Sequence, residues 1–199
     1  MKKLFALLAI TAIASSCGND DNQTSQNQEF FNLAEGNLWV YRRYDVTNGL
    51  ERVHPGNSID SVTVSGQEII EGQSYYKLHH TVQSYNDEFV RTDNNGHLVN
   101  SDGSVLHPGS DTTFTYSITN TYGTVSYRLE DRYNRTVEDN TYNLYPFVGY
   151  FIPVTGSDAP SGIGHTIDCV PGIGIVIRHE RYINSADYFE YRLVSHRLN

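Results

Sequence analysis

From Phe30 onward, apolar and polar residues alternate in short runs, and this period of two indicates β-strands with one buried face. Valine, threonine, tyrosine and isoleucine are frequent in these runs, and Asn-Gly, Pro-Gly and Asp-Gly pairs separate them. Long helical periodicity is absent. The runs that predict strands cover residues 38–46, 58–70, 74–85, 88–92, 97–100, 112–119, 122–133, 172–183 and 187–198.

Turn-forming residues connect several of these strands. Asn48-Gly49 predicts a type I′ hairpin, because asparagine and glycine tolerate positive φ. Glu71-Gly72 joins the second and third runs, and Asn184-Ser185-Ala186 joins the last two. Residues 143–151 are ambiguous, and they predict either a short helix or an aromatic loop.

The strand pattern predicts a single all-β domain over residues 29–199. About nine or ten short antiparallel strands can form a curved sheet, a β-sandwich or a closed barrel, and periodicity alone does not separate these architectures.

The residues before the domain have the order of an export signal. Lys2 and Lys3 precede an apolar run over residues 4–13 that is too short to span a bilayer, and small residues follow it. Cys17 then stands where the lipobox of bacterial lipoproteins has its lipidated cysteine, so residues 1–16 are predicted to be cleaved. The acyl chains of such proteins, palmitate among them, would anchor Cys17 stably to a membrane.

Residues 17–28 are polar and predict a flexible tether. The acidic run at residues 18–22 resembles the surface-export signal of Bacteroidetes lipoproteins, which implies an outer-membrane lipoprotein exposed on the cell surface. The alternative is that Asp20 and Asp21 only keep the linker solvated.

Charge and cysteine content narrow the range of possible functions and the role expected for Cys169. Without Lys2 and Lys3, 12 basic residues remain against 23 acidic ones, and this negative surface disfavours binding to nucleic acid or to anionic head groups. Because Cys17 is committed to lipid, Cys169 has no disulfide partner, and its apolar neighbours predict a buried structural thiol.

No motif for a metal, a cofactor or catalysis is present, so none of these is expected. His79 and His80 would point to opposite faces of one strand, and the position of His80 predicts a hydrogen-bonded core or rim histidine. The Asp/Asn-rich segments 93–96 and 100–103 lack full calcium-loop spacing and predict Asx turns instead.

Two longer motifs resemble those of small Bacteroidetes-type outer-membrane lipoproteins. Residues 31–41 match F-x-L-x-x-G-N-x-W-x-Y, and residues 170–176 match P-G-x-G-x-V, although Val170 stands where alanine is commoner. Residues 191–195 resemble the closing strand. The resemblance implies a curved antiparallel sheet of half-barrel type, similar to lipoprotein carrier folds, and it brings no activity or catalytic residue.

Aromatic residues provide the main functional hint, with 15 Tyr, 8 Phe and one Trp. The densest segment contains the candidate ligand-binding residues Tyr145, Phe147, Tyr150 and Phe151, although cross-strand packing is the plainer explanation for most tyrosines. We therefore expect a non-enzymatic binding or accessory module for an apolar or saccharide ligand. The alternatives are a protein-interaction subunit of an outer-membrane complex and a hydrolase with an unrecognised acidic site.

Overall fold

The computed structural model describes residues 30–199 except 57, 83–84, 157–160 and 182–186. The predicted signal peptide, the lipidation site Cys17, the tether and the turn at residues 184–186 lie outside the described residues. No membrane-spanning helix occurs among the residues described. The described strands are β1 (Leu38–Thr47), β2 (Leu50–Val53), β3 (Ile59–Ile70), β4 (Gln73–His80), β5 (Glu88–Thr92), β6 (Leu98–Asn100), β7 (Val105–His107), β8 (Thr115–Thr119), β9 (Gly123–Leu129), β10 (Tyr133–Val137), β11 (Asn140–Pro153), β12 (Gly162–Val170), β13 (Gly174–Arg181) and β14 (Tyr188–Arg197).

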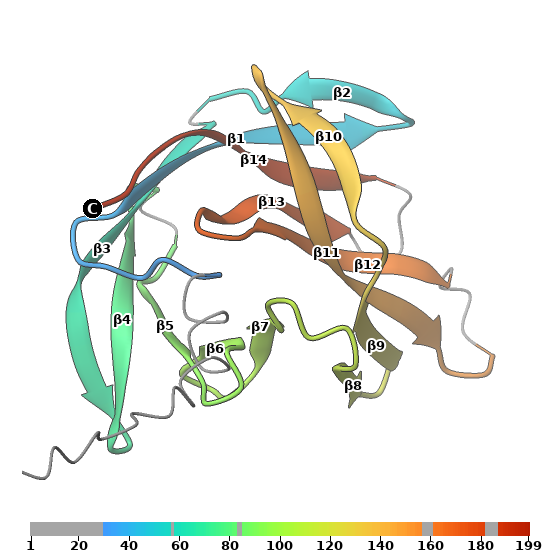
Figure 1. The fold of residues 1–199 in the computed structure, drawn as a ribbon. Coiled ribbons are helices and arrows are strands. Elements are labelled where there is room, and N and C mark those ends of the chain that lie inside the picture. The colour runs from blue at the N-terminus through green and yellow to red at the C-terminus, as the bar shows by residue number, and fades with distance from the viewer. Residues whose placement is uncertain (1–29, 57, 83–84, 157–160, 182–186) are drawn as a thin grey trace, which may run out of the picture.

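All fourteen of these strands belong to one antiparallel sheet. Its order is β7-β6-β5-β4-β3-β1-β14-β13-β12-β11-β9-β8, with β2 added to β1 and β10 added to β11. The sheet curls strongly, and the segment before β1 crosses its hollow side (Figure 1). The end strands β7 and β8 do not pair with each other, so the curved open sheet is confirmed over the sandwich and the closed barrel.

The hairpin turns predicted at Asn48-Gly49 and Glu71-Gly72 are confirmed. Asn48 and Gly49 have φ values of 51° and 76° between β1 and β2, and Glu71 and Gly72 have values of 50° and 79° between β3 and β4. Glycine adopts this left-handed region without the steric penalty of a Cβ atom.

The prediction of a helix or loop at residues 143–151 is wrong, because these residues lie within β11. This strand pairs with β12 on one side, and on the other side with β10 up to Leu144 and with β9 from Phe147. Pro146 sits between those two ladders, and its carbonyl accepts a bond from the Glu130 amide on that side. The missing N–H of Pro146 therefore breaks no ladder bond, which is how proline is tolerated inside a sheet.

Gly149 is the second residue that made β11 look unlike a strand. A Cβ atom there would lie 2.6 Å from the Tyr127 ring on β9, so glycine makes room for an aromatic side chain. The sequence pattern also fails to predict β2, β7, β10 and β12. Two of these, β2 and β10, are mostly exposed and show no alternation between apolar and polar faces.

Two groups of buried apolar side chains form the core. One contains Trp39, Val64, Val137, Leu144, Val176, Ile177 and Leu193, and the other contains Phe30, Phe31, Val90, Leu98, Ile167 and Cys169. The Cys169 side chain is fully buried, and burial raises the pKa of its thiol, which confirms the structural role expected for it.

The buried His107 links β7 to β11 across the curl. Its Nε2 donates to the Tyr145 carbonyl at 2.9 Å, and its Nδ1 accepts from the Gly109 amide at 3.0 Å. Edge strand β7 is thus attached to a strand that does not neighbour it in the sheet.

Candidate functional site

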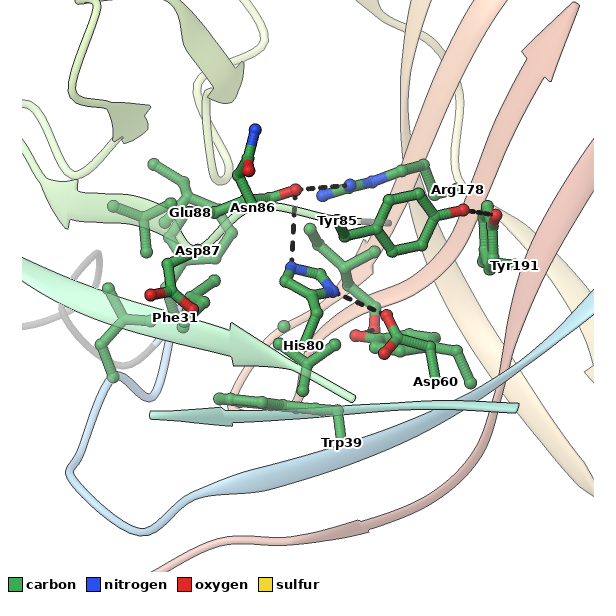
Figure 2. Close-up of a pocket in the computed structure, with 18 of the residues that line it drawn as sticks. Phe31, Trp39, Asp60, His80, Tyr85, Asn86, Asp87, Glu88, Arg178 and Tyr191 are labelled. Carbon is green, nitrogen blue, oxygen red and sulfur yellow. Dashed lines mark hydrogen bonds and ion pairs between the residues drawn. The ribbon is translucent and has the colours of Figure 1, made fainter. Parts of the chain in front are cut away.

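A cavity of about 460 Å³ opens on the hollow side of the sheet, between β3–β5 and β13–β14. The close-up in Figure 2 shows its lining side chains converging from these strands and from the segment before β1. The apolar part of the wall contains Phe31, Leu33, Trp39, Val62, Leu78, Val90, Leu98, Ile175 and Phe189.

The two sequence motifs meet at this cavity. Trp39 and Tyr41 come from the first motif, and two residues of the second motif accept their hydrogen bonds. Trp39 Nε1 donates to the Ile173 carbonyl at 2.7 Å, and the Tyr41 hydroxyl donates to the Ile175 carbonyl at 2.9 Å. Burial raises the pKa of Tyr41, so its hydroxyl stays neutral. These motifs therefore build a wall of the cavity as well as two strands.

Gly36 and Gly174 occupy glycine positions of the two motifs, and the backbone geometry shows why glycine suits them. Gly36 has φ of 85° in the turn before β1, and its amide donates to the Val64 carbonyl at 2.9 Å. Gly174 has φ of 93°, and a Cβ atom there would face Trp39 Nε1 at 4.0 Å. The glycines let the backbone turn so that Trp39 lies against β13.

One end of the cavity is polar and contains a buried histidine–aspartate pair. His80 Nδ1 lies 2.6 Å from Asp60 Oδ2, and both side chains are less than one-tenth exposed. The amides of Thr81 and Val82 donate to the other oxygen of Asp60 at 3.1 and 3.3 Å. Burial alone would raise the pKa of Asp60, but the bonds from His80 and the two amides lower it overall, so this carboxyl is ionised.

The second nitrogen of His80 faces an ion pair across the cavity. Glu88 Oε1 accepts from Arg178 Nη1 at 3.1 Å and lies 3.7 Å from His80 Nε2 (Figure 2). Burial opposes the ionisation of Glu88, but Arg178 lowers its pKa overall, and the pKa of Arg178 is raised in turn despite burial. Nε2 is buried and has no hydrogen-bond partner. A buried nitrogen without a partner is costly, so a ligand group that bonds to it would be favoured.

Two tyrosines lie beside the polar end. The hydroxyls of Tyr85 and Tyr191 contact each other, and the Tyr85 ring packs edge-on against the His80 imidazole with a centroid separation of 5.6 Å. Burial raises the pKa of Tyr191, so this hydroxyl is neutral at physiological pH.

The four predicted ligand-binding residues do not line this cavity. Tyr145 packs edge-on against Phe30, and its hydroxyl accepts from Arg132 Nη1 at 2.9 Å. Phe147 is buried and stacks with Tyr127 at a centroid separation of 5.5 Å. Both residues serve the packing of β11 against its neighbours.

The other two predicted residues also lie elsewhere. The Tyr150 hydroxyl donates to Glu130 at 2.8 Å under the guanidinium of Arg128. Phe151 lines a second cavity of about 150 Å³ together with Tyr127 and Arg181. The structure therefore does not bring the four residues together around one cavity, and their role in ligand binding stays a prediction.

The prediction for the paired histidines is confirmed. His80 shares the inner face with Leu78, whereas His79 points outward and its Nδ1 lies 2.8 Å from Asp87. The partner Asp60 was missed, because the contact depends on the register of β3 against β4, where Val62 opposes His80. The sequence signal that pointed to this site was the predicted burial of His80.

Metal-binding geometry does not occur within the described ranges: no group of three or more His, Cys, Asp or Glu residues could hold an ion. The Asx turns are confirmed, since Asp93 Oδ1 accepts from the Asn95 and His97 amides, and Asn100 Oδ1 accepts from the Asp102 and Ser104 amides.

Among the comparisons with known proteins, only the one with solved structures found similar chains. No protein-family model matches the chain, and no curated protein matches it. A candidate lipoprotein from Parabacteroides distasonis is similar with a TM-score of 0.40 at 14% identity, covering 84% of this chain and 98% of that chain. A candidate exported protein with a YmcC-like fold from Bacteroides fragilis has a TM-score of 0.48 at 12% identity, with the same two coverages, 84% and 98%. We draw nothing about function from these likenesses.

Proposed function

We propose that this protein is a lipid-anchored, non-enzymatic binding protein of the outer membrane that holds an apolar ligand on the hollow side of its sheet. The observation that carries the proposal is the preformed cavity of about 460 Å³, which has an apolar wall and a buried nitrogen, His80 Nε2, without a hydrogen-bond partner. Apolar concave sites with a few convergent polar groups are typical of small-molecule binding. The sequence of residues 1–22 supports the anchor and a location on the cell surface.

The composition of the wall favours an apolar ligand over a saccharide. A sugar carries hydroxyls around its whole ring and requires hydrogen-bonding partners on several sides. Here the hydrogen-bonding groups gather at the end with Asp60, His80, Glu88 and Arg178, whereas aliphatic and aromatic side chains form the opposite wall. A ligand with an apolar body and one polar end fits this division.

The same cavity gives less support to a hydrolase. Asp60 and Glu88 do converge on His80, but the pKa of each carboxyl is lowered, so neither is the proton donor that a pair of acidic residues requires. Among the described lining residues there is no serine, threonine or cysteine to act as a nucleophile. Binding is thus the function that the geometry favours.

Trp39 provides a direct test, because it is the single tryptophan of the chain and it lines the cavity. The mature chain with Cys17→Ser, which carries no lipid, would be titrated with the neutral apolar dye N-phenyl-1-naphthylamine, which accepts excitation energy from tryptophan. We expect saturable quenching of Trp39 and a matching rise in dye emission.

Two variants would locate the dye. Leu78→Gln puts an amide in the cavity wall and should weaken dye binding by about tenfold or more, because the buried amide would lack a partner. Ile69→Gln changes an exposed residue outside the cavity and should leave dye binding unchanged. Absence of saturable transfer, or equal binding by both folded variants, would refute the proposed function.

A further inference from the structure

The polar end of the cavity specifies the ligand more closely. Resting on the proposed function, we infer that the ligand is a neutral alcohol, with a hydroxyl that binds between His80, Glu88 and Arg178 and an apolar body that lies against Trp39 and Leu78. The site should therefore prefer a long-chain alcohol to the carboxylate and the ammonium of the same chain length.

The first step of the argument is the free nitrogen of His80. Because the ionised Asp60 lies 2.6 Å from Nδ1, that nitrogen donates its proton to the carboxylate, and Nε2 is the ring nitrogen that faces Glu88 across the cavity. Nε2 has no hydrogen-bond partner, and the His80 side chain is only 7% exposed. A ligand hydroxyl could supply the missing bond to Nε2, because a hydroxyl can act as a donor or as an acceptor.

The second step is the donor on the opposite side. Arg178 reaches the polar end from β13, and its guanidinium carries five N–H groups, more than the bond to Glu88 uses. A hydroxyl oxygen can accept from this guanidinium while the same hydroxyl bonds to His80 Nε2. An alcohol is both a donor and an acceptor, as these two neighbours require.

The third step is charge. Asp60, Asp87, Glu88 and Glu180 place four carboxyl groups around the cavity, against the single guanidinium of Arg178. A carboxylate bonded near His80 Nε2 would lie close to Glu88, which is 3.7 Å from that nitrogen, and Arg178 is already paired with Glu88. The carboxyl groups would attract an ammonium, but an ammonium carries donors only, so it offers Arg178 no acceptor and meets the like charge of its guanidinium.

The test compares three ligands that differ only in their polar end: 1-decanol, decanoate and decylammonium, each below its aggregation limit. Their ability to displace N-phenyl-1-naphthylamine from the mature Cys17→Ser chain would be measured by Trp39 energy transfer at neutral pH. We expect decanol to bind about tenfold more tightly than either ion, since an ion cannot satisfy both polar neighbours.

Substitution of Glu88 should reverse the preference. Glu88→Gln keeps the shape of the side chain but frees the charge of Arg178 for the ligand, so decanoate affinity should rise about tenfold. Glu68→Gln removes the same charge from an exposed position on β3 and should change nothing. His80→Leu should weaken decanol binding while the dye still binds, and His79→Leu, on the outer face, is its matched control.

The outcomes of these experiments distinguish the alcohol inference from the proposed function. If the dye binds but decanoate or decylammonium matches decanol, or if Glu88→Gln leaves the order unchanged, the alcohol inference is overturned and the apolar site stands. If neither the dye nor any of the three amphiphiles binds, the proposed function fails and the inference fails with it.

Discussion

Burial holds two histidines, His107 and His165, in the neutral form at physiological pH. Burial lowers the pKa of His107 from 6.5 to about 4, and it does the same to His165. In His107 both nitrogens are already used, one as a donor to Tyr145 and the other as an acceptor from Gly109. A second proton on this ring would break the bond from the Gly109 amide.

These histidines predict a loss of stability in mild acid. The unfolded chain binds their protons near pH 6.5, whereas the folded chain does not until about pH 4, so acid favours the unfolded state across that window. Asp168 offsets part of the loss, because its pKa is raised by burial to about 6 and its folded form takes up a proton first.

Urea unfolding of the mature Cys17→Ser chain at neutral pH and at about pH 5 would measure this dependence. We expect a lower free energy of unfolding at the acidic pH, and a shallower dependence in His107→Asn, which is also less stable. A free energy of unfolding that does not fall between the two conditions would contradict the prediction.

At the residue scale, period-two alternation was enough to place His79 and His80 on opposite faces and to predict that His80 is buried. It could not identify Asp60, Glu88 or Arg178 as its neighbours. Asp60 depends on the register between β3 and β4, and Arg178 comes from β13, on the other side of the cavity. Long-range contacts of this kind leave no trace in local periodicity.

At the scale of the element, β11 shows why local propensity can mislead. Pro146 and Gly149 are poor strand residues in isolation, yet each occupies a position where the neighbouring strands require it. Pro146 lies where β11 changes partner from β10 to β9, and Gly149 leaves space for the Tyr127 ring. Strand propensity reflects the neighbours of a residue as much as the residue itself.

Gly149→Ala should therefore destabilise the protein. Its Cβ atom would lie 2.6 Å from the Tyr127 ring, which is packed against Phe147, so the ring must shift at a cost of about 1–3 kcal/mol. Gly164→Ala is the matched control on β12, because its Cβ atom would meet Phe151 at an ordinary 3.7 Å. Thermal unfolding would compare them, and equal melting temperatures would show that Tyr127 moves without cost.

At the scale of the whole molecule, the sequence predicted the all-β class and the turns but could not choose how the sheet curves from periodicity alone. Only the resemblance of its motifs implied the half-barrel type. The curl depends on contacts such as His107 with the Tyr145 carbonyl, which join residues far apart in the chain. The cavity follows from that curvature, so its position could not be predicted from any one segment.

The proposed lipid anchor concerns the whole molecule, and its two cysteines allow the anchor to be tested. In a bacterium that processes lipoproteins, Cys17→Ser should move the protein out of the membrane fraction and abolish palmitate labelling, because the acyl chains supply the membrane affinity. Cys169→Ala changes a fully buried thiol and should keep both properties. Continued palmitate labelling of the Cys17→Ser protein would contradict the lipobox prediction.

The segment before β1 would connect the proposed anchor mechanically to the cavity. Phe31 and Leu33 form part of the cavity wall, and the Phe30 carbonyl accepts one bond from the Gly172 amide, outside the strand ladders. Tension that enters the domain at residue 30 would load these contacts one after another, whereas the bonds of a strand ladder share a load. A pull on the proposed anchor would thus reach the cavity wall before it reached the strands of the sheet.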